Sequence, residues 1–181
     1  MRAFPACEER LHNLAIPEER ERDPISLYLD IETRSFRNAN HYITVVGFFH
    51  EDTGLTQLIW PDLNAETLAA ALPEAEHIYT YNGNNFDIQV IRHHLGLDLL
   101  DYYISRDLMY DCWRHGLKGG LKAVERQLGI PREQPPLDNY QIQACWTRWK
   151  HKQDEEALAV LLKYNEEDVM NLVKLRKLLA V

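Results

Sequence analysis

The sequence predicts an α/β fold in which helices cover a sheet, and two observations carry this prediction. Four short segments rich in apolar and aromatic residues are typical of strands, and they lie at 25–31, 42–49, 55–60 and 77–81. From about residue 85 onward, apolar residues recur instead at spacings of three and four, the period of helices. Strands that come first, followed by helices with a further strand, indicate a layered α/β or α+β domain.

The first predicted strand alternates strictly between apolar and polar or aromatic residues. Because successive side chains of a strand point to opposite faces, Asp30 and Glu32 share one face. The opposite, apolar face consists of Leu27, Leu29 and Ile31. This strand is therefore expected to bury one face and to present two carboxylates on the other.

The predicted helices have recognisable ends. The first runs over 64–72, because Asn64 is a suitable N-cap and Pro73 cannot continue a helix. The second follows the Asn82-Gly83 turn and ends at Gly96, a residue that favours a C-cap. Further helices are predicted at 105–115, 121–128 and 140–150, and 154–179 is predicted as one kinked helix or two.

Length and composition are typical of one soluble domain. Residues 25–181 are predicted to form it, and residues 1–24 a charged N-terminal extension. No apolar run approaches the roughly 20 residues that span a bilayer, so no membrane association is expected. The three cysteines are widely spaced, which disfavours a zinc site or a disulfide framework and favours a reduced, cytoplasmic setting.

The net charge of −8 disfavours tight, non-specific binding to duplex nucleic acid. Basic residues nevertheless gather between residues 112 and 132, where a single acidic residue, Glu125, accompanies five of them. These five are Arg114, Lys118, Lys122, Arg126 and Arg132. Such a group serves either as a solvated helix surface or as a phosphate-binding surface, and the sequence leaves both interpretations open.

Acidic residues carry the chemical signal. Asp30 and Glu32 in the first strand, Asp87 after the turn and Asp168 in the last helical stretch come from distant parts of the chain. Alone, Asp-x-Glu is expected about once by chance in a chain of this composition, so the signal lies in the whole set. Converging carboxylates repel one another unless a cation joins them, and Mg²⁺ or Mn²⁺ suits such oxygen ligands. Metal-dependent phosphodiester cleavage is the leading hypothesis.

With these motifs in place, the chain resembles the DEDD 3′–5′ exonucleases of the ribonuclease H-like superfamily. The matching motifs are Asp30-Ile31-Glu32, the Asn-x-x-x-Phe-Asp stretch ending at Asp87, and Tyr-x-x-x-Asp ending at Asp168. Tyr164 at the start of the last motif indicates the tyrosine subtype. The segment GLKGGLKAVERQLGI is similar to that of a bacterial YprB-like branch. The resemblance implies a ribonuclease H-like fold, with a central mixed sheet flanked by helices, over about residues 25–181.

The resemblance also implies roles. Asp30, Glu32 and Asp168 would hold one of two divalent ions, Mg²⁺ or Mn²⁺, with Asp30 bridging to the second ion near Asp87. Tyr164 would orient the attacking water. Glu166 and Glu167 lie on other helix faces than Asp168 and are expected to be solvated. Asp107 is expected to cap a helix or to support a metal ligand from behind, rather than to bind metal itself.

Contacts to substrate are assigned to five further residues, and two of them have a structural alternative. Asn82 also suits a turn, and Phe86 suits either a core position or stacking on a base. The glycine-rich loop around Lys118 could contact a phosphate. The assigned residues are Thr33, Asn82, Phe86, Lys118 and Lys122.

The resulting hypothesis is a metal-dependent 3′–5′ exonuclease acting on single-stranded nucleic acid by a two-metal-ion mechanism. The alternatives are an RNase H-fold endonuclease, a hydrolase of short oligonucleotides, or a nucleic-acid-binding module without catalysis. The acidic residues disfavour the last of these, because a binding module gains nothing from unpaired carboxylates. Neither the preference for DNA or RNA nor any protein partner follows from the sequence.

Overall fold

Five strands form one mixed sheet at the centre of the molecule. The computed structural model describes residues 25–35, 41–135 and 137–181, so the predicted extension at 1–24 lies outside the described residues. The strands are β1 (Ser26–Ser35), β2 (His41–His50), β3 (Gly54–Ile59), β4 (His77–Thr80) and β5 (Ile104–Asp107). Their order is β3-β2-β1-β4-β5, which places β1 in the middle.

The two sides of β1 are paired differently. Along one side, β2 runs antiparallel to β1 over nearly its whole length, and β3 continues the antiparallel ladder. On the other side, β4 is parallel and its pairing with β1 ends where Tyr28 meets Tyr79. The part of β1 beyond Tyr28, which carries Asp30 and Glu32, therefore has a strand on one side only. That half-open edge is where the candidate site forms.

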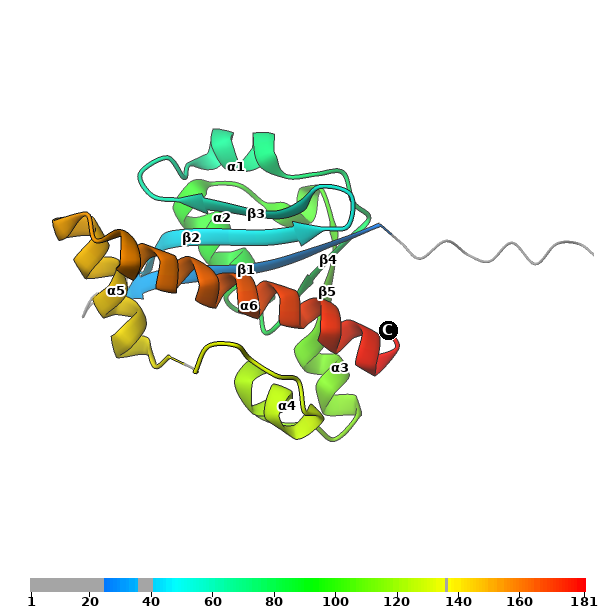
Figure 1. Cartoon of the computed structure of the whole chain (residues 1–181). Helices are drawn as coiled ribbons and strands as arrows, with labels where there is room; N and C mark the ends of the chain where they lie inside the picture. The colour runs from blue at the N-terminus through cyan, green and yellow to red at the C-terminus, as the bar shows by residue number, and fades with distance from the viewer. Residues whose placement is uncertain (1–24, 36–40, 136) are drawn as a thin grey trace, which may run out of the picture.

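Helices cover both faces of the sheet, as Figure 1 shows. Helices α1 (Ala65–Ala71) and α2 (Asp87–Leu95) lie on one face, and a short 3₁₀ turn at Leu99–Asp101 follows them. The other face is covered by the remaining four helices, of which α6 crosses the sheet. These are α3 (Leu108–Arg114), α4 (Leu121–Leu128), α5 (Asn139–Lys152) and α6 (Glu155–Leu179).

The predicted alternation of β1 is confirmed by the two cores that the sheet separates. The apolar side of β1 packs against α1 and α2, through residues such as Leu29, Leu68 and Ile91. Tyr28, on the opposite side, packs with residues of α3 and α6. The aromatic and carboxylate face of β1 thus lies under α6, which brings residues about 135 positions apart into contact.

The prediction of a helix over 105–115 is wrong in its first part. Residues Ile104–Asp107 form edge strand β5, parallel to β4, and α3 begins only at Leu108. A four-residue strand with two exposed positions has neither the length nor the alternation that marks a strand in sequence. The last helical stretch is one helix of 25 residues, capped by Asp154, with neither proline nor glycine to divide it.

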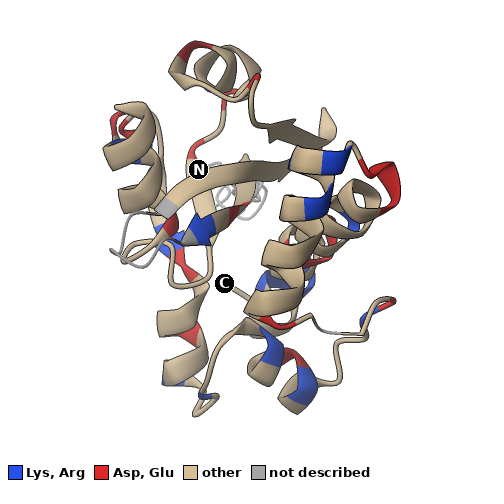
Figure 2. Ribbon diagram, turned by 90° about the vertical axis from the view of Figure 1, so that its left-hand side faces the viewer, with Lys and Arg blue, Asp and Glu red and all other residues tan. Residues whose placement is uncertain are grey.

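Among the residues that the structure describes, no helix combines the length and the apolar character needed to cross a bilayer. Basic and acidic residues are intermixed over the helices in Figure 2 rather than separated onto two faces. The fold class predicted from the sequence, a central mixed sheet flanked by helices, is confirmed.

Candidate metal centre

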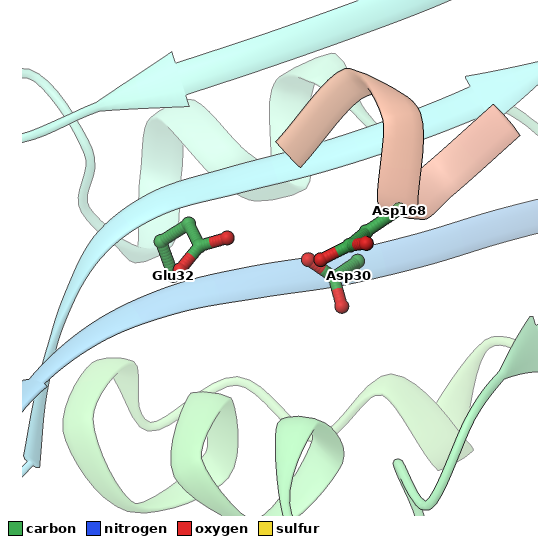
Figure 3. A group of neighbouring side chains, drawn as sticks. All are labelled: Asp30, Glu32 and Asp168. Carbon is green, nitrogen blue, oxygen red and sulfur yellow. The ribbon is translucent and has the colours of Figure 1, made fainter. Parts of the chain in front are cut away.

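Three carboxylates converge beside the middle of β1. Asp30 and Glu32 lie on the strand, and Asp168 points toward Asp30 from α6 (Figure 3). One oxygen atom of each carboxylate lies within 4.8 Å of those of the other two. Glu32 and Asp168 are buried and Asp30 is half-buried. We call these three residues the carboxylate cluster.

A hydrogen bond from α6 fixes Asp30 in the cluster. The amide Nδ2 of Asn165 donates to Asp30 Oδ2 at 3.0 Å and to the Asp30 carbonyl oxygen at 3.2 Å. Asn165 is itself held by Gln57 Nε2, which donates to its Oδ1 at 2.9 Å. Gly47, the partner of Asp30 on β2, makes this arrangement possible, because a Cβ there would overlap the Asn165 amide. A glycine on β2 is thus required by a contact at the candidate site.

The pairing of β1 with β2 is irregular beside Glu32, where Thr44 of β2 has no partner in the register. The register with β2 shifts between Glu32 and Thr33, and Thr44 Oγ1 donates to the Glu32 carbonyl oxygen at 3.0 Å. Bulges of this kind turn side chains away from the regular alternation and occur often beside functional sites. Here the shift separates the ordered ladder up to Glu32 from the strand end that borders the cleft described below.

Asp87 reaches the same part of β1 from the side that β4 leaves open. It is the first residue of α2, it is buried, and its Oδ1 accepts a hydrogen bond from the Ile31 N–H at 3.1 Å. This carboxylate therefore takes the place of a neighbouring strand as hydrogen-bond acceptor. It lies near enough to raise the pKa of Asp30, although the group of three mutually close oxygens does not include it.

Burial raises the pKa of all four carboxyl groups, and repulsion from other members of the four adds to this for Asp30, Glu32 and Asp87. Burial is the largest cause for Asp30 and Glu32, and the charge of Asp168 is the next. Burial raises the pKa of Asp87 to about 7, against the opposing effect of backbone hydrogen bonds. It also raises the pKa of Asp168, where the charge of Arg132 opposes it. A cation among these oxygens would relieve the repulsion.

Tyr164 and Lys122 lie beside the cluster. Tyr164, one helical turn before Asp168, is 3% exposed, and Lys122 Nζ lies 4.2 Å from the centre of its ring. Burial raises the pKa of both Glu32 and Asp168, and the charge of Lys122 lowers both. The structure thus brings the predicted substrate contact Lys122, from the first turn of α4, to the carboxylates.

An open cleft of about 360 Å³ borders the cluster. Besides Tyr164 and the three carboxylates, it is lined by the predicted contacts Thr33 and Phe86. Helix α5 supplies the remaining wall through Asn139, Ile142 and Gln143. A larger cavity of about 880 Å³ surrounds Arg176 at the far end of α6, and it contains none of the predicted site residues.

Three predicted substrate contacts, Asn82, Lys118 and Lys122, do not line the cleft, although Lys122 lies beside Tyr164. Asn82 adopts a left-handed conformation in the turn after β4, and its N–H donates to Asp107 Oδ1 at 2.7 Å. Asp107 also caps α3 by accepting from the Met109 N–H, as its expected capping role requires. Lys118 is exposed in the loop that precedes α4.

The expectation that Glu167 is solvated is wrong. Glu167 is 7% exposed, and its Oε1 accepts hydrogen bonds from the N–H groups of Glu133 and Gln134. The segment after α4 packs over this face of α6 and also brings Arg132 onto Asp168. The sequence presents Arg132 only as one charge of a basic stretch. No local pattern reveals it, because its partner Asp168 lies 36 residues away.

The chemistry of the donor set fits a divalent metal ion. Carboxylate oxygens are the ligands that Mg²⁺ and Mn²⁺ prefer, and the cluster offers three of them at mutual distances a single ion can bridge. The raised pKa values show that the fold alone does not balance these charges. The residues present therefore fit a bound cation.

A family model described as the RNase H superfamily matches residues 27–180, and the chain belongs to that superfamily. No curated protein matches the chain in sequence. The match covers every strand of the sheet and all four carboxylates.

Solved structures with a similar fold include a polymerase and nucleases. The family B DNA polymerase of the archaeon Pyrobaculum calidifontis is similar with a TM-score of 0.68 and 16% identity over 87% of this chain. The chain spans only 25% of that polymerase. A structure described as the apo form of the nuclease is similar with a TM-score of 0.54 and 18% identity, over 85% of this chain and 70% of the other. Brucella melitensis NrnC is similar with a TM-score of 0.55 and 13% identity, over 86% of this chain and 72% of that one. At these identities the likeness concerns the fold.

Proposed function

We propose that this member of the RNase H superfamily is a metal-dependent 3′–5′ exonuclease that hydrolyses phosphodiester bonds of single-stranded nucleic acid. The observation that carries the proposal is the convergence of Asp30, Glu32 and Asp168 within 4.8 Å, beside an open cleft. The polarity and the exonuclease activity rest on the resemblance of the motifs to the DEDD enzymes of the tyrosine subtype. Residues 25–181 constitute the catalytic domain in this proposal, and a cytoplasmic location is part of it.

In this proposal the carboxylate cluster holds one divalent ion, and Asp30 with Asp87 supports a second. When bound, two such ions activate the nucleophile and stabilise the leaving oxygen of the phosphodiester. Asp30 would suit a ligand of both ions, because its carboxyl group interacts with Asp87 as well as with the other two cluster members. Asn165 keeps Asp30 in this position through two hydrogen bonds.

The chain's own residues supply binding and orientation. Tyr164 lines the cleft one helical turn from Asp168, and in this proposal it would orient the attacking water. Lys122 brings a positive charge to a site that must accept an anionic phosphate. Phe86 and Thr33 line the cleft, where Phe86 offers an aromatic surface to a base. Asn82 and Lys118 remain candidates only for more distant contacts.

Short oligonucleotides are the second candidate substrate, and the charge of the molecule favours them. With a net charge of −8 and intermixed charges over its helices, the protein has little of the basic surface that long duplexes require. A cleft of about 360 Å³ is of the size that holds a small ligand. An endonuclease would need an extended surface to receive a continuous strand.

The experiment is hydrolysis of 5′-labelled single-stranded DNA and RNA, with a dinucleotide in parallel, in Mn²⁺, in Mg²⁺ and in EDTA. A ladder that shortens from the 3′ end only with metal, and is absent with Asp30→Ala or Asp168→Ala, supports the proposal. Cleavage of a circular substrate would identify an endonuclease. Binding without cleavage in both metals, for all substrates, would contradict an enzyme and favour the binding module.

A further inference from the structure

A buried arginine adjoins the carboxylate cluster. Arg132 lies between α4 and α5, and its side chain is 8% exposed. Its Nε donates to Glu125 Oε2 at 2.6 Å and its Nη2 to Glu125 Oε1 at 2.8 Å. This two-bond geometry fixes the plane of the guanidinium, which a lysine could not reproduce.

The partners of Arg132 are fixed in turn. Glu125 is 2% exposed and also accepts from Asn171 Nδ2 of α6 at 2.8 Å. Glu167 holds the segment that carries Arg132, because its Oε1 accepts from the Glu133 N–H at 2.6 Å and the Gln134 N–H at 3.0 Å. The guanidinium is therefore held from α4 and from α6, independently of the carboxylate cluster.

From this fixed position Arg132 reaches one cluster member. Its Nη2 donates to Asp168 Oδ1, and its guanidinium carbon lies 5.7 Å from the centre of the Tyr164 ring. Without this contact, Asp168 would face the repulsion of Asp30 and Glu32, which raises the free energy of its present side-chain position before a metal binds. A hydrogen bond from an immobile cation offsets that repulsion.

We propose that Arg132 is a positioning residue that holds Asp168 ready to bind metal, an inference that rests on the proposed function. The guanidinium engages one carboxylate oxygen of Asp168, while the other remains for the metal. Because Glu125 anchors Arg132, the contact does not have to break when the cation arrives. Hydrogen-bonded partners of metal ligands typically contribute about 10- to 100-fold to metal affinity.

The test is the dissociation constant of Mn²⁺, measured by titration calorimetry without nucleic acid, for the wild type and for Arg132→Gln. We expect Arg132→Gln to bind Mn²⁺ about 10- to 100-fold more weakly. Arg132→Lys, which keeps the charge but loses the fork, should recover part of the affinity. The matched control is Lys163→Gln, because Lys163 also joins α6 to the segment after α4, through Glu133, but at the surface. It should bind Mn²⁺ as the wild type does.

Folding is checked by circular dichroism in EDTA, because removing Arg132 leaves buried carboxylates without their partner. If Arg132→Gln does not fold, Glu125→Gln takes its place, since it loosens the anchor while leaving Arg132 and Asp168 intact. It should weaken Mn²⁺ binding in the same direction by a smaller factor.

Unchanged Mn²⁺ binding by a folded variant would overturn the inference, and tighter binding would also identify Arg132 as a competitor of the metal. A folded wild type that binds no Mn²⁺ would overturn the proposed function itself. The two failures are thereby distinguished, because one appears in the variants and the other in the wild type.

Discussion

Two groups of buried carboxylates lie next to each other along α6, and the fold treats them differently. In one group, Glu125 and Glu167 accept hydrogen bonds from an arginine, an asparagine and two backbone N–H groups. In the other, the carboxylate cluster, three groups face one another and burial raises the pKa of each. The first group receives its hydrogen bonds from fixed donors of the chain, the Arg132 guanidinium among them. The oxygens of the second group fit a cation placed among them.

Asp168 lies on the border between the two groups. It belongs to the cluster, yet it receives a hydrogen bond from Arg132, which also donates to Glu125 of the first group. Adjacent residues of one helix, Glu167 and Asp168, thus serve opposite purposes, one fastening a segment and the other facing the cleft. Burial of a carboxylate therefore does not identify a site. The two groups differ in their neighbours instead, because the carboxylates of the cluster face one another beside a cleft.

The largest effect should come from removing charge from the cluster without changing its shape. We expect Asp30→Asn to lower the rate of metal-dependent cleavage about a thousandfold or more, because metal ligation supplies several kcal/mol of transition-state stabilisation. The melting temperature in EDTA should stay the same or rise, since a repelled charge is removed. Single-turnover cleavage and thermal unfolding measure both, and a wild-type rate would remove Asp30 from the site.

The opposite result, a clear loss of stability, is expected when a carboxylate of the first group is removed. Glu125→Ala should lower the free energy of unfolding by about 3–5 kcal/mol, because it leaves Arg132 buried without its principal partner. Urea unfolding in EDTA measures this. Glu133→Ala is the matched control, since the Glu133 side chain is 78% exposed and its ion pair with Lys163 is worth at most about 1 kcal/mol. Equal losses in the two variants would contradict the distinction between the groups.

The pH dependence of the metal-free protein should reveal the unbalanced charges. Burial raises the pKa of Asp87 to about 7 from an ordinary 3.8, so the folded state binds this proton more tightly than the unfolded state. Its contribution to stability is full below about pH 4 and is lost as the pH rises to about 7. A difference of about three pKa units corresponds to at most about 4 kcal/mol.

Asp87→Asn should remove the Asp87 contribution to this slope, while Asp30, Glu32 and Asp168, whose pKa values are also raised, still contribute in both proteins. The difference between wild type and variant is the quantity to measure, by urea unfolding in EDTA from pH 4 to 8. Other carboxyl groups, such as Asp98 and Asp154, have lowered pKa values caused by hydrogen bonds, so they give slopes of opposite sign that both proteins share. Saturating Mg²⁺ should flatten the wild-type slope. Parallel curves for the two proteins would show that Asp87 titrates normally.

The part of the site that lies within single elements was accessible from the sequence. Strand alternation places Asp30 and Glu32 on one face, and helical spacing places Tyr164 and Asp168 one turn apart, as the structure shows. The fold class followed from the same two periodicities. Strand β5 escaped prediction because four edge residues, two of them exposed, carry no periodic signal.

Contacts between elements were not accessible in this way. Whether Glu167 is solvated depends on whether the segment after α4 passes over α6, and no local pattern states this. The same holds for Arg132 on Asp168 and for Asn165 on Asp30, which join residues 36 and 135 positions apart. The predicted extension at 1–24 and the roles assigned to the site residues stay predictions.

A smaller effect should follow from disturbing the support of Asp30. Gly47→Ala places a methyl group where Asn165 lies, so the amide must move away from Asp30. We expect a loss of about 1–3 kcal/mol in stability from overpacking, together with weaker Mn²⁺ binding. Gly120→Ala is the control, because a Cβ there meets no atom within 4 Å. Wild-type Mn²⁺ affinity in Gly47→Ala would show that Asn165 does not position Asp30.

The smallest effect is expected from Tyr164→Phe, because this change removes the hydroxyl group and keeps the packing of the ring. Its ring packs in the core with Ile142 and Trp146 and lies under Lys122, and Tyr164→Phe preserves all of this. Only the hydroxyl is lost, and one neutral hydrogen bond to water corresponds to about 0.5–1.5 kcal/mol, or up to about tenfold in rate. Single-turnover rates should fall by that factor, while the melting temperature and Mn²⁺ affinity stay unchanged. Unchanged kinetics would leave Tyr164 with a packing role alone, and the orientation of the attacking water would then belong to the carboxylates.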